Sequence, residues 1–246
     1  MSTKVNLSQP IRAQRSRMAP ADTKAAKSKP AGSKPAKSKP AGSKPASSKP
    51  ARKNSTANAA GEVRIIGGLW RRSKLPVANR PGLRPTPDRV RETLFNWLGQ
   101  DMSGLRCVDA FAGTGALGFE AASRGALDVL LVEGDTSLIT QLAKSKDKLK
   151  ADKVRVQRGD GIAILQGQAS GSVDVIFIDP PFEAPIFEKV LAAAAKAITA
   201  QGAIYLEAPK TWTDADLAAY GLQVHKAGKA GAVHYHLLHR TNCSTL

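Results

Sequence analysis

The stretch LRCVDAFAGTGALGFEAAS, residues 105–123, decides the fold. Its first part, LRCVDAF (105–111), is mostly apolar and predicts a buried strand of a parallel sheet. A G-x-G-x-x-G pattern follows at Gly113, Gly115 and Gly118, and the residues after the turn predict a helix over about 115–124. A strand, a glycine-rich turn and a helix in this order are the first unit of a doubly wound α/β domain.

The same alternation continues on both sides of this unit. Further strands are predicted at 128–133, 154–160, 173–179 and 202–208, and helices over 136–150, after 160, over 185–199 and near 213–219. Before the unit we predict a strand or hairpin arm at 62–70 and a helix over 87–100. After it, LQVHKAG and AVHYHLLHR are expected to pair antiparallel. The predicted fold is therefore α/β, a doubly wound, Rossmann-like sheet with a final antiparallel strand.

Four acids are placed where predicted strands end. Asp109, Glu133, Asp160 and Asp179 each stand at a strand's carboxyl end. Because parallel strands point their carboxyl ends to the same edge, these acids are expected together, at the edge where doubly wound sheets bind ligands.

The acids also indicate which ligand the glycine turn takes. A carboxylate at Asp109 would repel the pyrophosphate of a dinucleotide but attract a cation. S-adenosylmethionine carries an ammonium and a sulfonium and no phosphate, so we favour it over NAD; a turn without any ligand is the alternative. Glu133 can accept the ribose hydroxyls, and Asp160 can lie near the adenine amino group. The residues expected to bind this cofactor are Asp109, Phe111, Gly113, Thr114, Gly115, Glu133, Asp160 and Gly161.

The strand at 173–179 ends in Asp179-Pro180-Pro181-Phe182, which predicts catalysis. The Asp179 carboxylate and the Pro180 carbonyl can both accept N–H bonds from an exocyclic amine of a nucleobase. Held in this way, the nitrogen lone pair can attack the sulfonium methyl, and the two acceptors stabilise the developing charge. Pro181 helps to fix the carbonyl, and Phe182 offers a face for stacking on an unstacked base. The alternative is an acidic turn that merely ends the strand.

These motifs carry a family resemblance. DAFAGTG, Glu133, GDG and DPPF resemble motifs I to IV of the class I methyltransferases, and DPPF resembles the form found in enzymes that methylate exocyclic amines. RIIGGLWRRSKL (64–75) and RPTPDRVRETLFNWL (84–98) are similar to the RsmD family, over about residues 62–240. The resemblance implies methylation of guanine N2 in small-subunit ribosomal RNA, with ribosomal RNA or the assembling subunit as partner. The alternatives are methylation of DNA adenine or cytosine or of a protein glutamine, and a non-catalytic RNA-binding assembly factor.

Positive charge is concentrated in the N-terminal third of the chain. The net charge is +17, of which residues 1–62 contribute +12, residues 63–97 contribute +6 and the remainder −1. Such a field suggests a polyanionic partner, nucleic acid first. The segment 62–98 is therefore expected to contact RNA, although a solvated face is the alternative. The residues expected to do so are Arg64, Arg71, Arg72, Lys74, Arg84, Arg89 and Arg91.

Residues 1–61 are predicted to be a disordered basic tail before a methyltransferase domain at 62–246. Five copies of an SKPA-type unit at 28–52 offer nothing apolar to bury, and their prolines forbid a regular helix. The tail either tethers the enzyme to RNA or is a solubilising extension; a mitochondrial presequence is a weaker alternative. Two cysteines and no membrane-length apolar run favour a cytoplasmic protein. We expect no metal and a monomer.

Overall fold

A seven-stranded sheet forms the centre of the part of the chain that the structure, a computed structural model, describes: residues 61–78, 86–182 and 186–241. In sheet order the strands are β5 (Val154–Arg158), β4 (Asp128–Glu133), β3 (Arg106–Asp109), β6 (Val173–Ile178), β7 (Ile198–Ala208), β9 (Val233–Arg240) and β8 (Leu222–Ala230). The first five strands run parallel, and β9 is antiparallel to both of its neighbours. The predicted doubly wound sheet with antiparallel final strands is confirmed.

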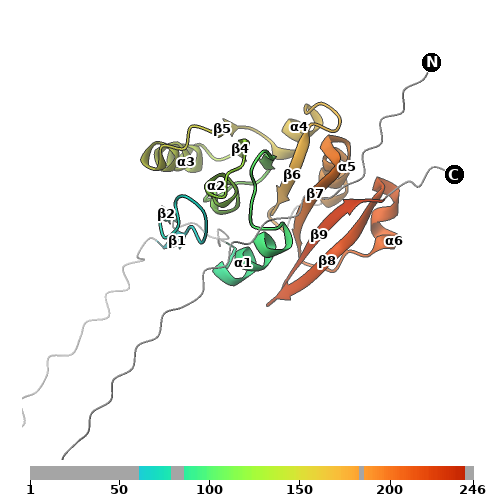
Figure 1. Ribbon diagram of the computed structural model, residues 1–246. Helices are drawn as coiled ribbons and strands as arrows, with labels where there is room; N and C mark the ends of the chain where they lie inside the picture. The colour runs from blue at the N-terminus through green and yellow to red at the C-terminus, as the bar shows by residue number, and fades with distance from the viewer. Residues whose placement is uncertain (1–60, 79–85, 183–185, 242–246) are drawn as a thin grey trace, which may run out of the picture. The chain divides into compact units, whose positions relative to one another are not determined.

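Helices cover both faces of the sheet (Figure 1). The helices are α1 (Asp88–Trp97), α2 (Ala116–Ser123), α3 (Thr136–Leu149), α4 (Gly161–Gln166), α5 (Phe187–Ala197) and α6 (Asp214–Leu217). Buried residues of α1, α2 and α3 share one core with Cys107 and Phe177, and those of α4, α5 and α6 share a second core with Val108 and Ile176. Because neighbouring strand residues point to opposite faces, consecutive apolar residues supply both cores, which is why these strands read as continuous apolar runs.

Local signals set the element boundaries. The carboxylates of Asp135 and Asp160 accept backbone N–H groups at the starts of α3 and α4. Helix α1 ends at Trp97, earlier than the predicted residue 100, since Gly99 and Gln100 adopt φ of 92° and 66°. The helix predicted near 213–219 is shorter and continues as a 3₁₀ turn, Ala218–Tyr220.

A small antiparallel hairpin precedes α1. Its strands are β1 (Glu62–Arg64) and β2 (Lys74–Pro76). The connection between them is bonded to α2: Ile66 and Gly67 donate their N–H groups to the Glu120 carboxylate, each at 2.7 Å. The predicted tail lies outside the described residues up to residue 60, as does Arg84.

None of the helices within the described ranges combines the length and apolar character that crossing a membrane requires.

Candidate active site and nucleic-acid interface

The strand order reverses between β3 and β6, and this point locates the candidate active site. From β3 the chain adds β4 and β5 on one side, and from β6 it adds β7 on the other. Open α/β sheets bind ligands at the carboxyl ends of the strands beside such a switch point. The structure places Asp109 at the end of β3 and Glu133 at the end of β4; Asp160 and Asp179 follow β5 and β6. The four acids therefore share one edge, as predicted.

The glycine turn after β3 needs its glycines. Gly113 and Gly115 have φ of 52° and 77°, the left-handed region that other residues adopt at a cost. A Cβ on Gly115 would also lie 2.7 Å from side-chain atoms of Leu142 and Phe119. The turn is therefore a tight backbone surface at the start of α2, beside the switch point.

Two acids hold this turn in place. The buried Asp109 carboxylate accepts the Gly118 N–H at 3.1 Å. Burial raises the pKa of Asp109 to about 7, and the charge of Glu133 adds to this, whereas the Gly118 bond opposes it. The half-buried Glu133 accepts the N–H groups of Gly113 and Asp135, both at 2.9 Å.

The other residues predicted to bind the cofactor lie in this turn or directly after β5. Thr114 is buried and Phe111 half-buried between the turn and the second core. Asp160 is exposed, and Gly161 lies so close to β3 that an added Cβ would be 2.1 Å from the Ala110 carbonyl oxygen.

The corner after β6 combines an acid, a buried proline and an aromatic ring. Pro180 is buried and Pro181 exposed. Phe182 is half-buried, and its ring centroid lies 6.5 Å from that of Phe187. Burial raises the pKa of the Asp179 carboxyl well above its usual value, and the negative charge of Glu207 raises it further.

Three residues at this corner were missed by sequence reasoning. The Thr86 hydroxyl lies 3.5 Å from Asp179 Oδ2 and 3.0 Å from Glu207 Oε1, and the Tyr205 hydroxyl donates to the same Glu207 oxygen at 2.8 Å. Glu207 lies near the carboxyl end of β7, so the rule that found the other acids could have found it. The partnership with Thr86, 121 residues away, had no signal in the sequence.

The structure corrects the prediction for Arg91. Its side chain is fully buried, so it cannot reach an RNA phosphate. The guanidinium is bonded to Asp88 at 2.6 Å, to Glu120 at 3.4 Å and to the Thr86 carbonyl at 3.2 Å. Arg91 therefore joins α1 to α2 and to Thr86, and these contacts give it a structural role.

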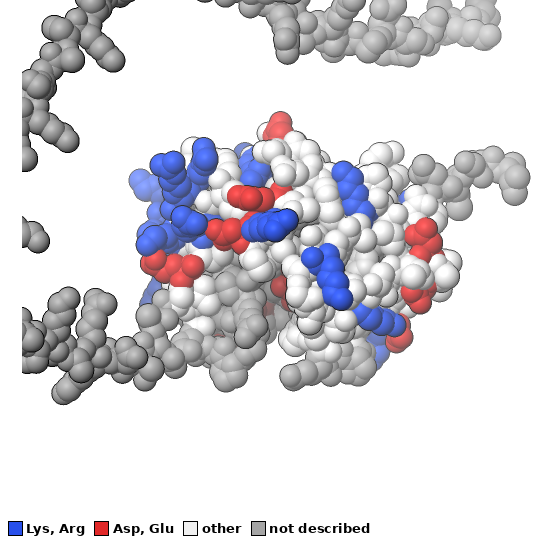
Figure 2. Space-filling view, turned by 90° about the horizontal axis from the view of Figure 1, so that it is seen from below, with Lys and Arg blue, Asp and Glu red and all other residues white. Residues whose placement is uncertain are grey.

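The other basic residues of this segment that the structure describes are exposed. Two of them pair with acids: Arg64 with Asp88 at 3.4 Å and Lys74 with Glu62 at 2.6 Å. Arg71, Arg72 and Arg89 are exposed as well. Figure 2 shows Lys and Arg side chains gathered at the side of the molecule where β1, β2 and α3 lie in Figure 1.

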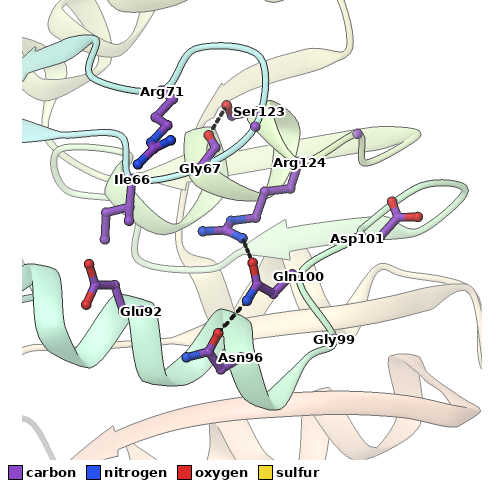
Figure 3. Close-up of a pocket in the computed structure, with 12 residues that line it drawn as sticks. Ile66, Gly67, Arg71, Glu92, Asn96, Gly99, Gln100, Asp101, Ser123 and Arg124 are labelled. Atoms are coloured by element: carbon purple, nitrogen blue, oxygen red, sulfur yellow. Dashed lines mark hydrogen bonds between the residues drawn. The ribbon is translucent and has the colours of Figure 1, made fainter. Parts of the chain in front are cut away.

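A cavity of about 910 Å³ opens between the hairpin, α1 and the end of α2. Arg71 and Glu92 point toward each other across it (Figure 3). Along its side, Arg124 contacts Gln100 at 3.4 Å and Gln100 donates to Asn96 at 2.7 Å. The cavity is thus lined by positively charged, negatively charged and amide side chains, which can donate and accept hydrogen bonds.

Together, the strand order, the glycine turn and the acidic carboxyl edge define a class I methyltransferase. The family model described as "Conserved hypothetical protein 95" matches residues 63–239. The chain belongs to this family, which confirms the predicted RsmD-like membership.

Named relatives agree with this assignment. Over 139 residues the chain is 45% identical to "Ribosomal RNA small subunit methyltransferase D" of Escherichia coli (strain K12), covering 56% of this chain and 70% of that protein. The protein of the same name from Haemophilus influenzae is 48% identical over 143 residues, covering 57% of this chain and 74% of the relative. The solved structure titled "Putative methyltransferase yhhF from Escherichia coli" superposes with a TM-score of 0.63 at 40% identity, covering 73% of this chain and 98% of that one.

Proposed function

We propose that this enzyme transfers a methyl group from S-adenosylmethionine to the exocyclic N2 amine of a guanine in small-subunit ribosomal RNA. The observation that carries the proposal is the Asp179-Pro180 corner, which stands at the switch point beside the glycine turn. The names of the relatives support the choice of ribosomal RNA.

The residues at the carboxyl edge fit S-adenosylmethionine. The set is acidic and offers Asp109, Glu133 and Asp160, which suits a cofactor with two positive centres and no phosphate. In this proposal Glu133 accepts the ribose hydroxyls, Asp160 and Gly161 border the adenine, and Gly113, Thr114 and Gly115 form the backbone surface beneath, with Phe111 at its side. When bound, the cofactor supplies an electrophilic methyl group.

The corner prepares the attacking amine. The lone pair of an exocyclic amine is delocalised into its ring, so the nitrogen is a weak nucleophile. We propose that the Asp179 carboxylate and the Pro180 carbonyl accept its two N–H bonds and hold it pyramidal. Both acceptors are fixed, Pro180 by burial and Asp179 by Thr86, so they stabilise the developing positive charge without reorganising.

The target base needs a stacking partner after it leaves the RNA stack. Phe182 is the half-buried aromatic ring that follows the acceptors, and its centroid lies 6.5 Å from that of Phe187. Stacking of a base on such a ring contributes about 1–3 kcal/mol. Pro181 limits the freedom of the backbone between the acceptors and the ring.

The basic hairpin and the cavity beside it are proposed to bind the RNA strand outside the active site. Arg64, Arg71, Arg72, Lys74 and Arg89 are exposed and can contact phosphates. The cavity lies beside α1. This helix has ten residues, is about 15 Å long, and begins two residues after Thr86. We also propose that the enzyme acts as a monomer in the cytoplasm, and that the basic residues 1–61 add non-specific RNA affinity.

Tritium transfer from labelled S-adenosylmethionine tests the substrate class. Small-subunit RNA, as naked RNA and as assembled subunits, is compared with DNA and with ribosomal protein. We expect label in RNA from one or both ribosomal preparations. Label in DNA or protein alone would show that the substrate is not ribosomal RNA. If no preparation takes up label and calorimetry detects no cofactor binding, the result favours the non-catalytic assembly factor.

A further inference from the structure

Glu207 has no role in the reaction as described above, yet it is built into the same corner. Its side chain is buried on β7. Burial of a carboxylate costs free energy unless the charge is paired and hydrogen-bonded. The only described groups that bond to it are the hydroxyls of Thr86 and Tyr205, both of which contact Oε1. No basic side chain within the described ranges forms an ion pair with it.

The Thr86 hydroxyl lies between Glu207 and Asp179 and has only one proton to donate. It is 3.0 Å from Glu207 Oε1 and 3.5 Å from Asp179 Oδ2. If both carboxyls were ionised, the hydroxyl could donate to only one of them. The second carboxylate, which can only accept, would then face the lone pairs of the hydroxyl oxygen without a proton between them. If one carboxyl carries a proton, it donates to Thr86, which in turn donates to the other. The geometry is therefore fully satisfied only when the pair shares one proton.

The surroundings favour the singly protonated pair. The acids that face Asp179 are Asp109 from β3 and Glu207 from β7. The Tyr205 phenol on β7 also interacts with Asp179, and Tyr235 on β9 neighbours Tyr205. Arg91 reaches this group only through the Thr86 carbonyl. Burial raises the pKa of Asp179 and of Glu207, and their mutual charge raises that of Asp179 further.

We propose that Glu207 is a positioning residue for methyl transfer: by holding the shared proton and passing a hydrogen bond through Thr86, it keeps Asp179 ionised to receive the target amine. This inference rests on the proposed function of the Asp179 corner. Two hydrogen-bond patterns exist for the pair. In the active one Glu207 donates to Thr86 and Thr86 donates to Asp179; in the inactive one the order is reversed and Asp179 carries the proton.

The transfer step balances with the pair in its active pattern. The amine nitrogen forms a bond to the methyl carbon, the carbon–sulfur bond breaks, and its electron pair remains on sulfur as a neutral thioether. The nitrogen, now positively charged, gives one N–H proton to the Asp179 carboxylate. That proton then leaves to water, which restores the singly protonated pair.

The substitution Glu207→Gln tests the proposal through the pH dependence of methyl transfer by the full-length enzyme. A glutamine amide donates to Thr86 as the protonated carboxyl does, but it cannot ionise. Because Glu207 is already neutral in the active pattern, the variant should lose the basic limb of the rate profile, at which the parent's pair gives up its shared proton. Its plateau rate should stay within about tenfold of the parent's, and its acid limb should stay nearly in place. Thr86→Val should move the acid limb to higher pH, since the hydroxyl bond that stabilises the Asp179 carboxylate is lost, and Thr86→Ser should restore it. Asp152→Asn, an exposed acid-to-amide change before β5, is the matched control and should leave both limbs in place.

Two results would overturn the proposal: a Glu207→Gln profile that keeps the parent's basic limb, or loss of transfer at every pH while S-adenosylmethionine still binds. Carbon-13 NMR titration of the Asp and Glu carboxyls, which needs no turnover, gives a second readout. In the parent, two carboxyls should titrate together, and in Glu207→Gln only one should titrate. This result supports the pair even if no RNA is methylated, so a failure of the proposed function can be distinguished from a failure of the pair. Independent titration of the two groups contradicts the pair.

Discussion

The Asp109 carboxyl ends β3 inside the protein, and its burial connects the candidate cofactor site to stability. A carboxyl that is harder to ionise in the folded protein than in the unfolded chain binds a proton more tightly when folded. With a pKa of about 7 in the folded state, Asp109 is protonated across a pH window in which the unfolded chain is not. A cation bound at the carboxyl edge would reverse this penalty by favouring the charged form.

Asp109→Asn should flatten the dependence of stability on pH. Between about pH 4 and pH 7 the folded state holds the Asp109 proton and the unfolded state has lost it, so the free energy of unfolding falls as pH rises, by at most about 1.4 kcal/mol per pH unit for this group. Denaturant unfolding at pH 5 and pH 7 should show a smaller fall in the variant than in the parent. Equal falls would mean that Asp109 ionises normally; Asp179 and Glu207 are expected to keep part of the slope in both proteins.

Gly161→Ala should be costly, whereas Gly167→Ala should not. A Cβ at residue 161 would lie 2.1 Å from the Ala110 carbonyl oxygen and force β3 and α4 apart. A Cβ at residue 167 meets its nearest atom at an ordinary 3.5 Å. We expect a loss of about 1–3 kcal/mol in the free energy of unfolding for the first change and under about 0.5 kcal/mol for the second. Similar losses for both would show that the contact at Ala110 relaxes freely.

Sequence reasoning at the residue scale succeeded where a residue follows an apolar strand and failed where distant segments meet. Asp109 and Asp179 could be placed because strand ends are readable from local pattern. The burial of Arg91 could not, because its partner Glu120 belongs to another helix and no local rule distinguishes this arginine from the exposed Arg89. Thr86 was quoted in the family segment, but its position between two acids depends on tertiary packing.

At the element scale, Glu120 connects the hairpin, α1 and α2. Its fully buried carboxylate accepts N–H groups of Ile66 and Gly67 and pairs with Arg91 and Arg124. A buried ion pair of this kind contributes little net stability, but removal of one partner leaves uncompensated groups behind. Since Arg91 also holds the Thr86 carbonyl, the same connection positions Thr86, whose hydroxyl contacts Asp179 and Glu207.

Glu120→Ala should destabilise the protein by about 3–5 kcal/mol and release the hairpin. Hydrogen exchange should show earlier exchange of the Ile66 and Gly67 amides than of amides in β6. Glu92→Ala, an exposed acid on the neighbouring helix, is the control and should change stability by under about 0.5 kcal/mol. If Glu120→Ala unfolds no more easily than Glu92→Ala, the connection does not hold the hairpin.

Elements were predictable to the extent that their signals are local. The alternation of apolar strands with helices gave every strand of the large sheet, and the aspartates that cap α3 and α4 fit the predicted starts. Strand β2 was not predicted, because three residues beside a proline carry too little pattern and depend on pairing with β1. The start of β7 at Ile198 was placed late, since the helix pattern of α5 runs directly into the strand.

At the scale of the whole molecule, the positive charge and the candidate catalytic residues lie in different parts of the chain. The basic residues belong to the N-terminal third, whereas the carboxyl edge of the sheet is acidic. In the proposed function a polyanion is attracted to the hairpin side, and only the reacting base enters the acidic edge. The overall imbalance was readable from composition, but its relation to the site required the fold.

The double substitution Arg71→Ala with Arg72→Ala should weaken RNA binding in a salt-dependent way. Each lost phosphate contact on single-stranded RNA should reduce the slope of log affinity against log salt by about 0.7. Cofactor affinity, measured by calorimetry, should not change. Lys226→Ala together with Lys229→Ala, two exposed lysines on β8, provides a matched loss of charge. If both double variants reduce the slope equally, the effect is one of net charge and not of the hairpin.

The most direct test of the central claim is nucleoside mass spectrometry of small-subunit ribosomal RNA after incubation with the enzyme and methyl-labelled S-adenosylmethionine, with Asp179→Ala alongside. We expect labelled N2-methylguanosine from the parent enzyme and none from the variant, whose cofactor affinity stays within a few-fold of the parent. Label on another nucleoside, or undiminished N2-methylguanosine from Asp179→Ala, would contradict it.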